Sequence, residues 1–77
     1  MNIEMADITL HINEETSADK RELLRDEFIK QNGVMSANSY SERPHLFVVT
    51  YDPGKIQSHS FLDIVKKQGL HAQLIGL

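Results

Sequence analysis

The chain has 77 residues, contains no cysteine and carries a net charge of −3 with its histidines neutral. This length predicts one small domain, residues 1–77, with little room for a deep catalytic cleft. The missing cysteines exclude disulfides, thiolate metal sites and thiol catalysis, and the acidic balance argues against nucleic-acid binding, for which Lys and Arg supply most of the affinity.

The first six residues have neither the basic start nor the apolar stretch of a signal peptide. No apolar run in the chain approaches the roughly 20 residues that are needed to span a bilayer. We therefore expect a cytoplasmic protein that does not insert into a membrane.

A strand is predicted over about residues 6–13, because apolar and polar side chains alternate there. The polar stretch after it ends in Thr16 and Ser17, which are both good N-cap residues. Thr16 and Asp19 form a weak variant of the capping box. A helix with one apolar face is then predicted over about residues 17–31.

The second half of the chain predicts two more strands, a helix and a last strand. Residues 34–41 are poor in strand-forming side chains, so we expect only a short edge strand there. Residues 42–44 predict a turn, and the apolar run 46–51 predicts the strongest strand of the chain. A helix over about residues 58–68 and a short strand over 70–77 follow.

This order predicts an α+β, ferredoxin-like βαββαβ sandwich, in which a four-stranded antiparallel sheet carries both helices on one face. The other face is then open to solvent or to a partner. Strand alternation places the aromatic residues of 46–51 toward the helices and Leu46 and Val48 on the open face. The open face therefore lacks the aromatic residues of this strand, on which bases would stack, and we expect no nucleic-acid partner.

A turn sequence, Tyr51-Asp52-Pro53, is followed by the second predicted helix, by Gly69 and by Ala72. In this order and spacing the chain resembles the heavy-metal-associated domains, in which a strand that ends in Tyr-Asp-Pro leads to a helix, a Gly and an Ala. Gly33-Val34 is similar to the Gly-Val that follows the first helix of that family, so the resemblance covers about Ile8 to Ile75. It implies the ferredoxin-like fold and a metal-binding ancestry.

The metal motif of that family is missing from this chain. The resemblance aligns Met-x-Cys-x-x-Cys with the start of the first helix, where Glu15, Ser17 and Lys20 replace Met, Cys and Cys, and Thr16 lies between them. Soft ions such as copper(I) need thiolate or thioether ligands. We therefore expect no cofactor and no metal at these former metal-loop positions.

Other interpretations of this loop stay open at the level of sequence. Ser17 and Lys20 have the spacing of a serine nucleophile and a lysine base, although a helix cap followed by a solvated lysine is simpler. The free N–H groups of the helix start, with Lys20, would also suit an anion such as phosphate. Because no nucleophile has a credible base and orienting partner, we expect that the chain is not an enzyme.

The four histidines raise the question of a replacement metal site. His11 alternates with apolar residues and should lie on the open sheet face, and His71 is near the start of the last strand, which neighbours the first strand in this fold. His11 and His71 are therefore candidate ligands for a divalent ion such as zinc, copper(II) or nickel. Two imidazoles alone form a weak site, since zinc normally takes four ligands.

Two functional hypotheses follow. In the first, the chain is a non-enzymatic binding module that has lost the cysteine site and contacts a protein partner or a second copy through His11, Leu46 and Val48. In the alternative, it is a metal carrier or sensor in metal homeostasis that uses His11 and His71. An amino-acid-sensing ACT-like domain has the same topology, but the Tyr-Asp-Pro turn matches the metal family better.

Overall fold

Six elements follow one another in the predicted order β-α-β-β-α-β. A computed structural model describes residues 4–75 of the chain. The elements are β1 (Ala6–Ile12), α1 (Ala18–Ile29), β2 (Val34–Tyr40), β3 (Arg43–Tyr51), α2 (His59–Lys67) and β4 (Ala72–Ile75). Neither of these helices is long and apolar enough to cross a membrane.

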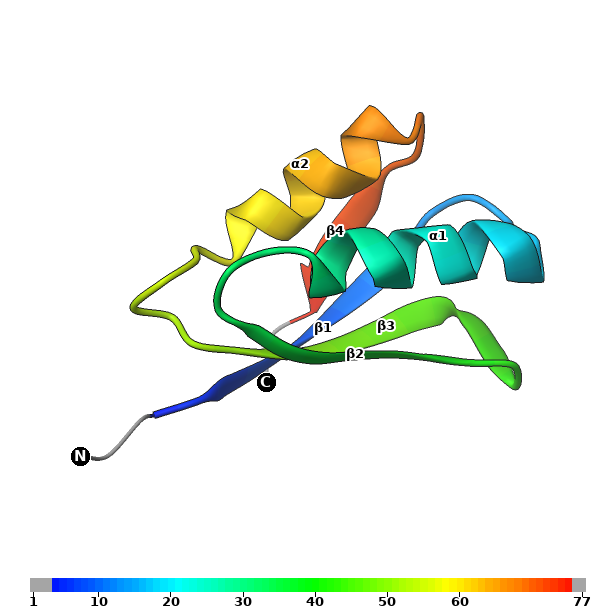
Figure 1. Cartoon of the computed structure of the whole chain (residues 1–77). Helices are drawn as coiled ribbons and strands as arrows, with labels where there is room; N and C mark the ends of the chain where they lie inside the picture. Colours follow the sequence, from blue (N-terminus) through cyan, green and yellow to red (C-terminus); the bar gives the residue numbers. More distant parts are fainter. Residues whose placement is uncertain (1–3, 76–77) are drawn as a thin grey trace.

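The four strands form one sheet in the order β2-β3-β1-β4, and every neighbouring pair is antiparallel. Both helices lie on the same face of this sheet (Figure 1). The structure therefore has the predicted ferredoxin-like architecture, with one covered and one open sheet face.

The start of α1 differs in detail from the prediction. Ser17 is the N-cap, and its side chain accepts a hydrogen bond from the backbone N–H of Lys20 at 3.1 Å. The capping box predicted for Thr16 and Asp19 is wrong, because the extended backbone of Ser17, one residue later, leads into the helix. Asp19 still lies in the first helical turn, where a carboxylate is favoured by the helix dipole.

Two predicted boundaries in the second half also change. Arg43 and Pro44 belong to β3 and not to a turn, so the connection between β2 and β3 is only Ser41 and Glu42. β2 is a full seven-residue edge strand whose pairing with β3 is interrupted at two places, beside Met35 and beside Tyr40. Of the predicted last strand, residues 76–77 lie outside the described residues.

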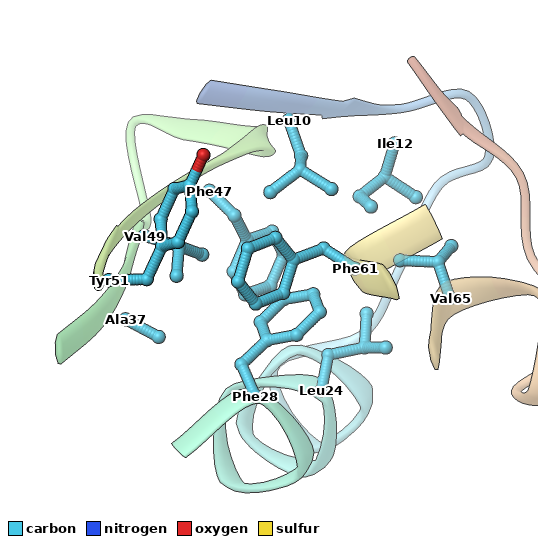
Figure 2. Close-up of a cluster of buried hydrophobic side chains, with 10 residues drawn as sticks. All are labelled: Leu10, Ile12, Leu24, Phe28, Ala37, Phe47, Val49, Tyr51, Phe61 and Val65. Carbon is cyan, nitrogen blue, oxygen red and sulfur yellow. The ribbon is translucent and has the colours of Figure 1, made fainter. Parts of the chain in front are cut away.

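The core fills the space between the sheet and the two helices (Figure 2). The ring of Phe28 on α1 meets the rings of Phe47 and Phe61 edge-on, each at 5.7 Å between ring centres. Phe61 meets Tyr51 in the same way at 5.2 Å. Such edge-to-face pairs add about 0.5–1.5 kcal/mol each to the free energy gained by burying the rings. Within residues 4–75 the buried apolar residues are Leu10, Ile12, Leu24, Phe28, Ala37, Phe47, Val49, Tyr51, Phe61 and Val65.

Candidate functional site

Three connections meet at one end of the sheet, which we call the loop end: residues 13–17, 41–42 and 68–71 (Figure 1). They meet because β1 ends where β3 and β4 begin, as shown by the pairing of His11 with Leu46 and of Ile12 with Ala72. The former metal-loop positions and the residues His11, His45 and His71 all lie at or beside this end.

The loop between β1 and α1 is held by its own polar groups. The guanidinium of Arg21 donates a hydrogen bond to the carbonyl oxygen of Thr16 at 2.7 Å. The hydroxyl of Thr16 is buried and has no hydrogen-bond partner among the described residues. The Arg21–Thr16 hydrogen bond and the Ser17 cap fix the loop as the entry to α1.

A soft metal ion does not fit this loop. The Ser17 hydroxyl already accepts the backbone N–H of Lys20 and is a neutral, hard donor, and the ammonium group of Lys20 repels a cation. The carboxylate of Glu15 is a hard ligand as well. Nowhere in residues 4–75 do three or more His, Cys, Asp or Glu side chains come together in an arrangement that could hold a metal ion. The chain therefore lacks the donor set that the family resemblance implies for copper(I).

The carboxylate of Glu14, in the loop after β1, contacts both the backbone and the ring of His71, which precedes β4. The backbone N–H of His71 donates to one carboxylate oxygen of Glu14 at 2.8 Å, and its ring Nδ1 lies 2.6 Å from the other. The His71 side-chain and backbone hydrogen bonds lower the pKa of Glu14 from its ordinary value of 4.5, because they favour the ionised carboxylate. This contact ties the α2–β4 connection to the β1–α1 loop.

His11 pairs with a different histidine from the one considered at the level of sequence. Its ring lies 5.4 Å from the ring of His45, and the two ring planes are nearly parallel, at 13°. The Nδ1 atom of His45 lies 2.6 Å from the backbone carbonyl oxygen of Ile12. The structure thus gives His11 the partner His45 and gives His71 the partner Glu14.

The open sheet face carries a row of side chains that crosses all four strands. Val48 in β3 pairs with Asn38 in β2 and with Thr9 in β1, and Thr9 pairs with Ile75 in β4. Ile75 is 42 % exposed. Leu46 and His11 form the next row toward the loop end. The predicted surface residues His11, Leu46 and Val48 are therefore neighbours on this face, and Ile75 extends the row to the edge of the sheet.

His45 and Ile75 are the site residues that sequence reasoning missed. His45 was assigned to the residues before the strand, but β3 begins at Arg43, which places His45 opposite the end of β1. A strand extended backward through His45 would have placed it next to Leu46, the residue of β3 that pairs with His11. For Ile75 the available signal was its alternation with Leu74, which packs against the core.

No protein-family model matches the chain, and no curated protein matches it. Solved structures do match it. Oxidized MerP from Ralstonia metallidurans CH34 superposes with a TM-score of 0.84 at 18% identity, covering 95% of this chain and 100% of that one. The CopZ metallochaperone gives a TM-score of 0.80 at 19% identity, covering 88% and 100%. This chain has the ferredoxin-like fold of the heavy-metal-associated domains.

A copper binding domain from HMA7, a P-type ATPase, matches as well, with a TM-score of 0.81 at 17% identity over 91% of this chain and 93% of that one. At these identities the likeness concerns the heavy-metal-associated fold. The chemistry of the loop end must be judged from the residues of this chain.

Proposed function

We propose that this heavy-metal-associated-like domain is a non-enzymatic interaction module that pairs with a second copy of itself through the open sheet face. The observation that carries the proposal is the row of Asn38, Val48, Thr9 and Ile75, in which the partly exposed Val48 and the exposed Ile75 set two apolar side chains on the side that no helix covers. Exposed apolar groups in the middle of a sheet are stabilised when another surface removes them from water.

The charge distribution favours a second copy as the occupant. The chain as a whole carries a net charge of −3, and the helices present charged side chains of both signs, such as Glu22 and Asp26 on α1 and Lys66 and Lys67 on α2. Among the described residues in the open-face rows of Asp7, Thr9 and His11, the one carboxylate is that of Asp7, which accepts a hydrogen bond from the Thr50 hydroxyl at 2.6 Å. Two identical open faces can therefore approach with little charge repulsion.

The size of the face predicts how strong this association is. Four strands about 4.8 Å apart and about seven residues long give a footprint of roughly 400 Å². A stable interface of ordinary size buries about 800 Å² on each partner. We therefore expect a weak dimer that forms only at high protein concentration.

Sedimentation velocity and amide NMR spectra over a concentration series test the proposal. With rising concentration we expect growth of a dimer and shifts of the amides of Thr9, Val48 and Ile75. Val48→Lys should abolish both effects, since it places a like charge on each copy at the centre of the interface. The matched control Leu23→Lys, on the exposed side of α1, should leave dimerisation unchanged.

A chain that stays monomeric up to millimolar concentration would overturn the proposal. So would concentration-dependent shifts that appear on α1 and not on the open face. The alternative metal carrier with His11 and His71 as joint ligands is not proposed, because His71 is held by Glu14 and His11 faces His45.

A further inference from the structure

We propose that His11 and His45 together bind a divalent transition-metal ion of the zinc, nickel or copper(II) class. This site is separate from the former cysteine loop and does not depend on the proposed dimer. It lies where the end of β1 and the start of β3 pair side by side, so the backbone that carries both histidines is fixed by the sheet.

The hydrogen bond of His45 leaves the correct ring nitrogen available. A carbonyl oxygen only accepts hydrogen bonds, so Nδ1 of His45 must carry a proton and donate it to the Ile12 carbonyl at 2.6 Å. In the neutral imidazole, Nε2 then has the free lone pair that a metal needs. A backbone carbonyl behind a coordinating histidine is also the usual support that fixes its tautomer and ring orientation.

The spacing of the two rings suits a shared ion. Zinc lies about 2.0–2.1 Å from each coordinating imidazole nitrogen, and a tetrahedral angle at the metal then separates two ring centres by about 5 Å. The ring centres of His11 and His45 are 5.4 Å apart. The two rings stack with nearly parallel planes, at 13°, so their in-plane lone pairs converge on one ion only after the ring of His11 turns about its Cβ–Cγ bond. His45 keeps its hydrogen bond to Ile12 during this rotation, and the paired strands need not move.

The surroundings admit a hydrated cation. His45 lines a hollow of about 240 Å³ together with Glu15, Thr16, Arg21, Ser41 and Pro44. In this hollow the carboxylate of Glu15 favours a cation and the guanidinium of Arg21 opposes one, so the ion must lie on the side of His45 that faces His11. With two imidazoles as the protein ligands, water completes the coordination. Imidazole suits zinc, nickel and copper(II), while copper(I) prefers sulfur, so we expect binding of the first group only.

Calorimetric titration of the full chain with zinc chloride tests the site. We expect one zinc ion per chain in the wild type and at least a tenfold loss of affinity in His11→Asn and in His45→Asn. His71→Asn, at the same end of the sheet, and His59→Asn, on α2, are the matched controls and should retain the wild-type affinity within about twofold. A wild type that shows no binding at millimolar zinc would overturn the proposal.

The controls also separate this site from the pair His11 and His71. If His71→Asn weakens binding as much as His45→Asn does, the assignment of His45 is wrong. His45→Asn also removes the hydrogen bond to Ile12 and can disturb the fold. For this reason the amide NMR spectrum of the wild type is also recorded with copper(II), a paramagnetic ion that broadens the signals of nearby residues. Substoichiometric copper(II) should broaden the amide signals of His11, Ile12 and His45 first. Broadening centred on Glu14 and His71 would contradict the inference.

Discussion

Single side chains determine what the loop end can bind. Ser17 and Lys20 are the residues that the resemblance aligns with the cysteines of the heavy-metal-associated family, and the structure uses them in the helix cap. His11 was placed correctly on the open face from strand alternation alone. Its partner His45 could not be found in the same way, because a contact between rings on two strands depends on the register and on where β3 begins. Register is set by the whole sheet and not by the residues near His45.

The contact between Glu14 and His71 predicts a pH dependence of stability. The pKa of Glu14 is lowered in the folded chain by the hydrogen bonds from His71. A carboxyl group with a lowered pKa stabilises the fold above its unfolded pKa, and this stabilisation is lost as the pH falls through the folded value. Between about pH 5.5 and pH 3 the urea midpoint of the wild type should therefore fall more steeply than that of Glu14→Gln. Glu22→Gln, which changes an exposed carboxylate on α1, is the control and should retain the wild-type slope. Equal slopes for Glu14→Gln and the wild type would contradict the prediction.

At the scale of elements, the alternation of apolar and polar residues identified the buried faces of the strands. It missed the length of β2 and the start of β3. β1 and β3 were predicted with the correct inward faces, since one side of each strand is buried against the helices. β2 was predicted as weak and short, yet it forms seven residues, because pairing with β3 supplies the hydrogen bonds that its own composition does not favour. Pro44 suggested a turn, but the first residues of a strand tolerate proline.

Two glycines with positive φ follow the helices, Gly33 in the turn directly before β2 and Gly69 directly after the C-cap of α2. Gly33 has φ +102°, and a Cβ atom there would lie 2.8 Å from the Cβ of Lys55. Gly69 has φ +78°, and a Cβ atom there would meet nothing within 4 Å. Gly69→Ala should cost about 1–2 kcal/mol, the penalty of a left-handed backbone. Gly33→Ala should cost more, because the segment around Lys55 must also move. Urea unfolding of both variants measures this difference, and equal losses would show that the close approach to Lys55 is relieved without cost.

At the scale of the whole molecule, the fold and the metal chemistry depend on different residues. The architecture follows from the core and from the strand order, and it agrees with solved structures that are less than a fifth identical in sequence. The donor atoms at the loop end do not contribute to that core. The heavy-metal-associated fold could therefore be predicted from the apolar pattern and the turns, while the binding function could not. The assignment of residues 1–77 to one domain and the cytoplasmic location stay predictions.

If the backbone of the loop between β1 and α1 matches that of the heavy-metal-associated domains, two cysteines placed there should restore the affinity for a soft metal ion. The double variant Ser17→Cys, Lys20→Cys places both sulfur atoms on the first turn of α1, where the Ser17 side chain already contacts the backbone of Lys20. We expect this variant to take copper(I) from a chromophoric chelator, and the wild type to take none. Ser17→Cys, Asp19→Cys has the same two thiols at the wrong spacing and should compete more weakly. Failure of the first variant to compete would mean that the loop geometry differs from that of the family.

The strand order also has a consequence for how quickly the chain reaches this structure. β2 and β3 are joined by two residues and can pair as a hairpin within microseconds. The centre of the sheet is different, since Leu10 of β1 lies beside Phe47 of β3, with a helix and another strand between them in the sequence. Closing that long loop costs entropy before any of its contacts form. The rate of folding should therefore be limited by the arrival of β1 at a preformed hairpin, and it should respond to changes in β1 and α1 more than to changes in the short edge strand β4.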